Sequence, residues 1–305
     1  MMRKSVATHH KEPVSMSSPK IGFIGYGAMA QRMGANLRKA GYPVVAYAPS
    51  GGKDETEMLP SPRAIAEAAE IIIFCVPNDA AENESLHGEN GALAALTPGK
   101  LVLDTSTVSP DQADAFASLA VEHGFSLLDA PMSGSTPEAE TGDLVMLVGG
   151  DEAVVKRAQP VLDVIGKLTI HAGPAGSAAR LKLVVNGVMG ATLNVIAEGV
   201  SYGLAAGLDR DVVFDTLQQV AVVSPHHKRK LKMGQNREFP SQFPTRLMSK
   251  DMGLLLDAGR KVGAFMPGMA VADQALALSN RLHANEDYSA LIGAMEHSVA
   301  NLPHK

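Results

Sequence analysis

The sequence predicts an α/β protein in which a doubly wound parallel sheet is followed by an all-helical domain. The chain has 305 residues, and single hydrophobic cores tend to divide at about 250 to 300 residues. From residue 20 to about residue 172, short apolar runs alternate with helix-like segments, as in parallel strands covered by helices. After Gly176 the alternation ends and apolar residues recur at helical spacing. Two domains of different architecture are therefore expected.

The strands expected in the first half are short and apolar, with helical segments such as PDQADAFASLAVEHG between them. In chain order they are IGFIG, VVAY, IIIFCV, LVLD, FSLLD, LVMLV and LTIH. The residues before the first strand contain no apolar core of a secretory signal. We expect a disordered leader at residues 1–19, a sheet domain at 20–175 and an all-helical domain for substrate binding and oligomerisation at 176–305.

Composition excludes several classes of function. With 46% hydrophobic and 19% charged residues and a net charge of -5, the chain lacks the basic excess of a nucleic-acid-binding protein. The only cysteine, Cys75, allows neither a disulfide framework nor a cysteine metal cluster. No segment reaches the ~18 uninterrupted apolar residues of a membrane span. We expect a cytoplasmic protein without a metal, a membrane or a nucleic acid as partner.

The stretch IGFIGYGAMA raises the question of whether the first strand leads into a dinucleotide site. Gly25 permits a tight turn, Gly27 lets a pyrophosphate approach the backbone, and Ala30 is small enough for helix–strand packing. The following helix would direct its N-terminal amides at the phosphates. Glycine-rich turns also occur without a ligand, but the position at the first strand favours a Rossmann-type NAD(P)-binding domain. The expected cofactor-binding residues of this turn are Gly25, Tyr26, Gly27, Ala28 and Met29.

The residues after the second strand bear on the choice of cofactor. An acidic residue that would bind a ribose 2′-hydroxyl is absent from the stretch APSGGK. Ser50, Lys53 and the glycine amides could instead receive a 2′-phosphate, although a flexible turn with a solvated lysine is the alternative. NADP(H) is therefore favoured, and NAD(H) remains open.

Two further motifs suggest catalytic chemistry. In DAPMSGS, Ser133 follows a strand at the carboxyl edge of the sheet, where a hydroxyl beside glycine amides suits a carboxylate; an ordinary Ser/Gly turn is the alternative. After Gly176, Lys182 and Asn186 are four residues apart on one helical face, where they interrupt an apolar set. This pair is expected in a seam between the domains, where Lys182 is either salt-bridged or catalytic.

Together these motifs resemble the β-hydroxyacid dehydrogenase family, which includes 3-hydroxyisobutyrate dehydrogenase, tartronate semialdehyde reductase and the glyoxylate/succinic semialdehyde reductases. The resemblance runs from about Lys20 to the end of the chain. It rests on IGFIGYGAMA as the cofactor loop, DTSTVSP beside the nicotinamide, DAPMSGS as the substrate loop, GPAGSAARLKLVVN as the catalytic helix and SKDM as the cofactor-closing motif. Residues 133–150 look most like the glyoxylate/succinic semialdehyde reductase branch.

The resemblance implies roles for residues in four of these motifs. Thr107 and Lys250 would contact the cofactor, and the loop of Ser133, Gly134 and Ser135 would hold the substrate carboxylate. In the catalytic helix, Lys182 would be the general acid/base and Asn186 would orient the substrate. The resemblance also implies a homodimer or homotetramer.

The sequence departs from the family at three places. The frequent Asn-Arg-Thr after the second strand is Ala48-Pro49-Ser50 here, which leaves cofactor choice least secure. Ala30 replaces a common glycine. His226 and His227 stand where small or apolar residues are common, either shaping an unusual substrate pocket or lying on the surface as solvated side chains.

The expected function is the NAD(P)-dependent interconversion of a small 3-hydroxy acid and its semialdehyde, with Lys182 moving the proton. One alternative is an imine reductase-like NADPH enzyme, although such enzymes usually carry an aspartate or tyrosine at the position of Lys182. The other is a non-catalytic dinucleotide-binding module that acts through protein contacts, whose signature would be loss of that lysine.

Overall fold

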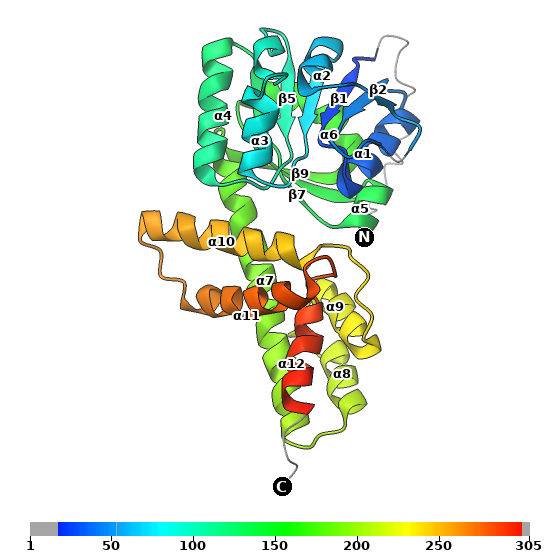
Figure 1. The fold of residues 1–305 in the computed structure, drawn as a ribbon, viewed down its shortest axis with the longest axis vertical. Helices are drawn as coiled ribbons and strands as arrows, with labels where there is room; N and C mark the ends of the chain where they lie inside the picture. Colours follow the sequence, from blue (N-terminus) through cyan, green and yellow to red (C-terminus); the bar gives the residue numbers. More distant parts are fainter. Residues whose placement is uncertain (1–17, 53, 301–305) are drawn as a thin grey trace, which may run out of the picture.

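The computed structural model describes residues 18–52 and 54–300. Most of the predicted leader, residues 1–17, and the predicted phosphate-binding Lys53 lie outside the described residues. A sheet covered by helices forms the first half of the chain, and a group of helices forms the second (Figure 1). Helix α7 (Ser177–Ala205) begins beside the sheet and continues through the helical half (Figure 1).

The sheet contains every strand expected from the sequence and two short additional ones. Its hydrogen-bonded order is β3-β2-β1-β4-β5-β6-β8-β7, and β9 pairs with β8. The strands are β1 (Ile21–Ile24), β2 (Val44–Tyr47), β3 (Glu57–Met58), β4 (Ile71–Phe74), β5 (Leu101–Asp104), β6 (Ser126–Asp129), β7 (Met132–Ser133), β8 (Leu144–Gly149) and β9 (Gly166–Gly173). Strands β3 and β7 have two residues each, too few for a periodic pattern to reveal them.

The sheet is mainly parallel, as expected, and departs from that arrangement at one edge. Strand β8 is antiparallel to both β6 and β7, whereas the strands from β3 to β6 are parallel to one another. Between β7 and β8 lies only α5 (Thr136–Thr141), whose 6 residues span about 9 Å at 1.5 Å per residue. This connection is too short to return the chain to the opposite edge of the sheet, so β8 enters in the reverse direction.

The strand order reverses between β1 and β4, because β2 and β3 extend the sheet to one side and β5 and β6 to the other. In open α/β sheets, ligands bind beyond the carboxyl ends of the strands at such a switch point. Strand β1 ends at Ile24, directly before the predicted cofactor turn, and β5 ends at Asp104, directly before the predicted nicotinamide-side loop. The fold therefore brings these two motifs to one edge.

Helices cover both faces of the sheet, which makes it doubly wound. Alternate residues of β4 illustrate this. Ile71 and Ile73 pack into the core under α1 (Ala28–Lys39) and α6 (Glu152–Ile165). Ile72 and Phe74 pack into the core on the other face, under α2 (Pro62–Ala68) and α4 (Pro110–His123). The covering helices are α1 (Ala28–Lys39), α2 (Pro62–Ala68), α3 (Asp79–His87), α4 (Pro110–His123), α5 and α6 (Glu152–Ile165), with the 3-10 turn η1 (Leu93–Ala95).

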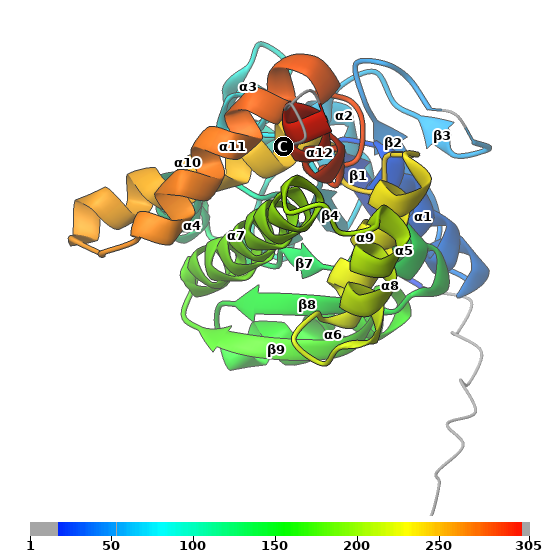
Figure 2. The ribbon, with the colours of Figure 1, turned by 90° about the horizontal axis from the view of Figure 1, so that it is seen from below.

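The second half is built around α7, against which α10, α11 and α12 pack (Figures 1 and 2). The helices after α7 are α8 (Arg210–Gln219), α9 (Pro225–Asn236), α10 (Thr245–Val262), α11 (Pro267–His283) and α12 (Ala290–Ala300). Among the helices that the structure describes, α7 is the one long enough, and with a mean hydropathy of 1.5 apolar enough, to cross a membrane. It also carries buried polar residues, Lys182, Asn186 and Asn194, among the packed helices, and we interpret it as the core helix of this half.

Candidate active site

The glycine turn after β1 has the form that a phosphate-binding turn requires. Gly25 has a φ of 88°, and a Cβ there would come within 2.4 Å of the carbonyl oxygen of Cys75. Gly27 and Ala28 are exposed, and a Cβ on Gly27 would meet nothing within 4 Å. No side chain of a described residue caps the N-terminus of α1, which leaves the amides of Ala28 and Met29 to bind an anion, while the Ala30 amide meets the Cys75 thiol.

Tyr26, one of the predicted cofactor-binding residues, directs its side chain away from this turn. The side chain is 2% exposed, and its hydroxyl makes hydrogen bonds with Thr56 Oγ1 at 2.8 Å and Asp54 Oδ2 at 3.1 Å. A Cβ on Gly34 of α1 would come within 2.6 Å of the same hydroxyl oxygen. Tyr26 is therefore a core residue of the turn, and it presents only its backbone to a ligand.

The turn after β2 leaves Ser50 exposed and its nearest acidic side chain occupied. Asp54, the first acidic residue after this strand, forms an ion pair with Arg38 at 3.0 Å and accepts a hydrogen bond from the Thr56 amide at 3.1 Å. These contacts hold the pKa of Asp54 below its usual value against the opposing effect of burial. Its carboxylate is thus committed to protein partners.

The loop that follows β6 presents one free hydroxyl and one engaged hydroxyl. Ser133, the last residue of β7, is half-buried, and its hydroxyl makes no hydrogen bond with any residue that the structure describes. Gly134 has a φ of 132°, and a Cβ there would lie 2.8 Å from Leu144 Cδ2. Ser135 donates from its hydroxyl and its amide to Glu138 Oε2, at 2.9 and 2.8 Å. Of the two predicted serine ligands, only Ser133 is available without breaking a hydrogen bond.

Hydrogen bonds to Asp129 and an ion pair with Glu138 connect this region with the helical half of the chain. Asp129, at the end of β6, accepts hydrogen bonds from the Gly176 amide at 2.8 Å and the Ala179 amide at 2.9 Å, so its carboxylate fixes the start of α7. Arg229 on α9 donates to Glu138 Oε1 at 2.9 Å. Both contacts bring helices of the second half against the loop that contains Ser133.

Lys182 and Asn186 lie one turn apart on α7 and hydrogen-bond to each other. The Lys182 ammonium is only 8% exposed and donates to Asn186 Oδ1 at 2.8 Å. Asn186 donates from Nδ2 to Asp251 Oδ2 on α10 at 2.6 Å. Asp251 Oδ1 lies 2.9 Å from Lys250 Nζ, and Lys250 also donates to the carbonyl oxygen of Thr107 beyond β5. A continuous polar network thus joins the predicted catalytic pair to the predicted nicotinamide-side loop.

The environment of Lys182 makes it a better proton carrier near neutral pH than an ordinary lysine. Burial disfavours the charged ammonium and lowers the pKa of Lys182 to about 8. The carboxylate of Asp251 opposes this shift, and the charge of Lys250 adds to it. A group with a pKa near the working pH is present in both protonation states, as reversible proton transfer requires.

Sequence reasoning missed two residues, Asp251 in this network and Asp129 at the start of α7. Asp251 follows Lys250 directly in the SKDM motif, and Asp129 is the first residue of DAPMSGS. Both were part of motifs already singled out, but a buried hydrogen bond between α7 and α10 or between β6 and α7 leaves no pattern in the sequence. Only the fold shows that these carboxylates meet the start and the middle of α7.

The interpretation of His226 and His227 as surface side chains was wrong. His227 is 6% exposed, with ring nitrogens 2.8 Å from Ser224 Oγ and 3.0 Å from the carbonyl oxygen of Met189. His226 Nε2 lies 2.6 Å from the hydroxyl oxygen of the buried Tyr288. Burial lowers the pKa of both rings, to about 4 for His226, so both are neutral at physiological pH. Their hydrogen bonds hold the start of α9 against α7 and the segment before α12.

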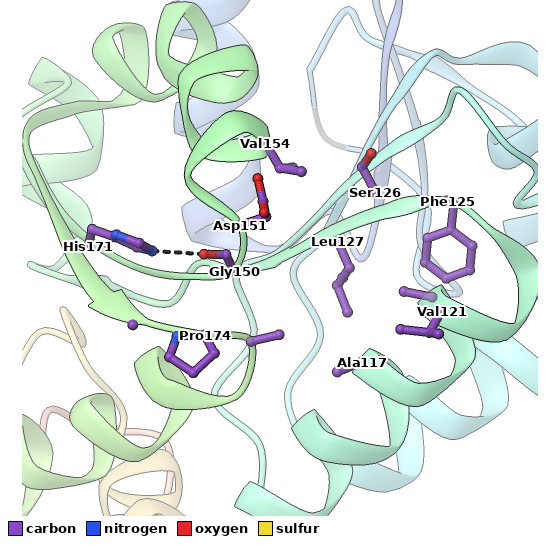
Figure 3. Close-up of a pocket in the computed structure, with 13 residues that line it drawn as sticks. Ala117, Val121, Phe125, Ser126, Leu127, Gly150, Asp151, Val154, His171 and Pro174 are labelled. Carbon is purple, nitrogen blue, oxygen red and sulfur yellow. Dashed lines mark hydrogen bonds between the residues drawn. The ribbon is translucent and has the colours of Figure 1, made fainter.

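A groove of about 650 Å³ lies elsewhere, between α4 and the region where β9 ends (Figure 3). It is lined mainly by apolar side chains, including Val121, Phe125 and Val154, and His171 Nε2 lies 2.8 Å from the Gly150 carbonyl oxygen at its edge. None of the predicted site residues lines this groove. The candidate active site is therefore the seam at the strand ends and not this groove.

Comparison with known families gives matches over both halves of the chain. The NAD binding domain of 6-phosphogluconate dehydrogenase matches residues 20–173. The NAD-binding domain of NADP-dependent 3-hydroxyisobutyrate dehydrogenase matches residues 176–295. These spans follow the sheet half and the helical half of the fold.

Individual relatives match along nearly their whole length. The chain is 33% identical to 2-(hydroxymethyl)glutarate dehydrogenase of Eubacterium barkeri, over 92% of this chain and 95% of that protein. It is 30% identical to glyoxylate/succinic semialdehyde reductase 1 of Arabidopsis thaliana, over 92% and 99%. A solved structure of Mycobacterium tuberculosis 3-hydroxyisobutyrate dehydrogenase with L-serine superposes with a TM-score of 0.80 at 31% identity, over 92% of this chain and 99% of that one. The protein therefore belongs to the β-hydroxyacid dehydrogenase family and is an NAD(P)-dependent oxidoreductase of the 3-hydroxyacid type.

Proposed function

We propose that the protein interconverts a small 3-hydroxy acid and its semialdehyde, with Lys182 as the general acid/base. The observation that carries this proposal is the buried Lys182, with its pKa lowered to about 8, hydrogen-bonded to Asn186 in the seam between the halves. A salt-bridged structural lysine, the alternative raised by the sequence, would contact a carboxylate directly. Lys182 contacts an amide instead, and the nearest carboxylate, Asp251, is bonded to that amide.

The chemistry assigned to the chain's own residues is a proton transfer. In the reductive direction, negative charge builds on the substrate's carbonyl oxygen, and the Lys182 ammonium donates a proton to that oxygen. In the oxidative direction, the neutral Lys182 amine removes the hydroxyl proton. The amide of Asn186, fixed by Asp251, orients Lys182 and the substrate oxygen. A bound nicotinamide dinucleotide would supply or accept the hydride.

The turn at Gly25–Met29 and the free start of α1 fit a dinucleotide. The open space over Gly27, the exposed Ala28 and the absence of a side-chain cap support a pyrophosphate at this helix end. NADP(H) is favoured over NAD(H), because Asp54 is bound to Arg38 and Thr56 and is not free to accept a ribose hydroxyl. Thr107 and Lys250 would close the nicotinamide end of the site from two sides, and Ser50 would meet the 2′-phosphate.

The substrate carboxylate is assigned to the loop after β6. The free hydroxyl of Ser133 and the backbone of Gly134 offer donors without a bulky side chain between them. The relatives described above are named for small carboxylates, 2-(hydroxymethyl)glutarate, glyoxylate and succinic semialdehyde, which supports the same class of substrate here. Ser135 takes a smaller part, because its hydroxyl is held by Glu138.

We further propose that the protein is a soluble, cytoplasmic homodimer or homotetramer without nucleic-acid or membrane partners, divided into domains at residues 20–175 and 176–305. Val184, Val188, Val195 and Tyr202 form one exposed apolar stripe along α7, each more than half exposed, and a second copy of this chain would cover it. The net charge of -5 supports the exclusion of nucleic acid.

The substrate class is tested by following NADPH oxidation with a panel of semialdehydes, uncharged aldehydes and cyclic imines. Turnover of the carboxylate-bearing semialdehydes is expected. Turnover of the uncharged aldehydes and of the cyclic imines should be much slower. Preferential turnover of the imines would support the imine reductase alternative instead. Binding of NADPH without turnover of any panel member would favour a non-catalytic dinucleotide-binding module.

A further inference from the structure

Two buried carboxyl groups face each other beneath the nicotinamide-side loop. Glu82, on α3, is 0% exposed, and Asp104, the last residue of β5, is 3% exposed. Their carboxyl groups lie within hydrogen-bonding range of each other. Because an ionised carboxylate only accepts hydrogen bonds, a hydrogen bond between these two requires a proton on one of them.

The hydrogen bonds around the pair indicate which residue holds that proton. Asp104 Oδ1 accepts from the Ser106 amide at 3.0 Å, which stabilises a negative charge on Asp104. Glu82 Oε1 accepts from Gln112 Nε2 on α4 at 2.9 Å. The other oxygen, Glu82 Oε2, is buried and receives no hydrogen bond from any described residue. Of the two Glu82 oxygens, Oε2 is the one left without a donor, and a proton on it would have the Asp104 carboxylate as its acceptor.

The charged groups near the pair add no positive charge that would favour full ionisation. Asp79 on α3 lies near Glu82, Asp129 at the end of β6 lies near Asp104, and the Cys75 thiol after β4 is neutral because burial raises its pKa to about 11. Among the residues that the structure describes, no lysine or arginine forms an ion pair with either carboxyl. Burial raises the pKa of both acids, most strongly that of Glu82.

The pair is attached to the loop that closes the predicted nicotinamide side. Ser106, whose amide is held by Asp104, accepts a hydrogen bond through its Oγ from the Val76 amide at 3.1 Å, and this joins the turns after β4 and β5. The next residue, Thr107, accepts from Lys250 through its carbonyl oxygen. The hydrogen bond from the Ser106 amide thus ties this turn to the Asp104 carboxylate, which faces Glu82.

We propose that Glu82 and Asp104 share one proton and that this carboxyl pair positions the Ser106–Thr107 turn for cofactor binding. Glu82 is thus a positioning residue, and the effect on the cofactor rests on the proposed function above. When both groups ionise, two like charges in contact repel each other in a site of low polarity, and the turn loses its support. Cofactor affinity then falls at alkaline pH.

The shared proton has its own signature in the pH dependence of stability. In the unfolded chain Glu82 releases its proton near the ordinary glutamate pKa, whereas the folded protein retains it. The stabilisation is complete below the unfolded pKa, and it is lost as the pH rises towards the raised folded pKa. Glu82→Gln keeps a donor towards Asp104 and an acceptor towards Gln112, and it cannot ionise.

The first experiment measures denaturant unfolding of the wild type, Glu82→Gln and Glu84→Gln between about pH 5 and about pH 9. Glu84 is exposed on the same helix and serves as the charge-matched control. The stability of Glu82→Gln relative to the wild type is expected to grow steadily with pH, while Glu84→Gln runs parallel to the wild type. If Glu82→Gln also ran parallel to the wild type, no proton would be shared and the proposal would be overturned.

The second experiment measures NADPH affinity by fluorescence titration of the same folded proteins and of Glu82→Leu. At neutral pH, Glu82→Gln is expected to bind like the wild type, and Glu82→Leu about tenfold more weakly because the hydrogen bond to a charged acceptor is lost. At alkaline pH, Glu82→Gln should retain the affinity that the wild type loses. Equal affinity of all three proteins at every pH would refute the positioning role. Failure of the wild type to bind either NADPH or NADH would refute the proposed function, while the unfolding experiment would still decide whether the proton is shared.

Discussion

Asn186 donates a 2.6 Å hydrogen bond to Asp251, which lies 65 residues further along the chain. The same amide group accepts from Lys182 through its oxygen. Its two polar atoms are therefore both occupied, and its orientation is fixed from α10. The position proposed for Lys182 as a proton donor thus depends on a residue of another helix.

Replacement of Lys182 by alanine should lower kcat by roughly 10² to 10⁴-fold, the usual contribution of general acid/base catalysis. NADPH affinity should barely change, because the cofactor phosphates are assigned to the turn at Gly25–Met29 in the other half of the chain. Asn186→Ala should cost less, since it removes orientation but leaves a proton source. Single-turnover kinetics with a fluorescence titration of NADPH would separate the two effects. Near-normal turnover by a folded Lys182→Ala protein would make this lysine structural.

The pH dependence of turnover should follow the pKa of Lys182, which is about 8. Reduction needs the ammonium, so kcat/KM for the aldehyde should be level below that pH and fall about tenfold per unit above it. Oxidation needs the neutral amine and should show the opposite slope. Asp251→Asn removes a charge that favours the ammonium. In this variant the pH at which kcat/KM begins to fall should therefore be lower than in the wild type. If that pH were the same in Asp251→Asn and the wild type, the titrating group would not be Lys182.

Ser133→Ala should raise KM for carboxylate-bearing substrates more than for uncharged aldehydes, because the lost hydroxyl is the one that makes no hydrogen bond with a described residue. Ser135→Ala is the matched control, since the Ser135 hydroxyl is already bound to Glu138. Steady-state kinetics with succinic semialdehyde and an uncharged aldehyde of similar length would measure both. Equal effects of Ser133→Ala on the two substrates would remove Ser133 from the carboxylate site.

The protein should prefer NADPH to NADH, because Asp54, the first acidic residue after β2, is bound to Arg38 and Thr56 and is not free to accept a ribose hydroxyl. The preference is measured as the ratio of kcat/KM for the two cofactors. Ser50→Ala should reduce this ratio by weakening NADPH alone. A tenfold preference of the wild type for NADH would contradict the assignment.

A charge placed on the apolar stripe of α7 should dissociate the oligomer. Val188 is 54% exposed in the single chain, and a second copy would bury it, so Val188→Asp should shift the mass measured by light scattering to that of one chain. Val121→Asp on α4, where the valine is 85% exposed, is the control and should leave the mass unchanged. A wild type that is monomeric at all concentrations would exclude this interface.

Local sequence patterns predicted more of the fold than of the candidate site. Runs such as LVLD predict strands because both faces of a parallel strand are buried, and β5 is buried at all four residues. The reversed direction of β8 depends on the length of a connection, which apolar patterning does not report. The site depends on contacts distant in sequence. Lys182 and Asn186 could be paired by their spacing. The hydrogen bonds that Asp251 and Asp129 make with α7 could not be predicted, because these residues are distant from it in sequence. The burial of the Tyr26 side chain in the core was not predicted either.

The two hydrogen bonds from Asp129 to the start of α7 also have a consequence for the exchange of parts between relatives. The carboxylate belongs to the sheet half and the amides of Gly176 and Ala179 to the helical half. In a chimera of two relatives joined at residue 175, these hydrogen bonds can form only if the relative that supplies the sheet half has a carboxylate at the position of Asp129. The helical donor contributes two backbone amides to these bonds, and it must keep a glycine at residue 176, where φ is 87° and a Cβ would lie 2.5 Å from Asp114 Oδ1. Recombination across the junction is thus asymmetric, and the sheet half decides whether the long helix starts in the right direction.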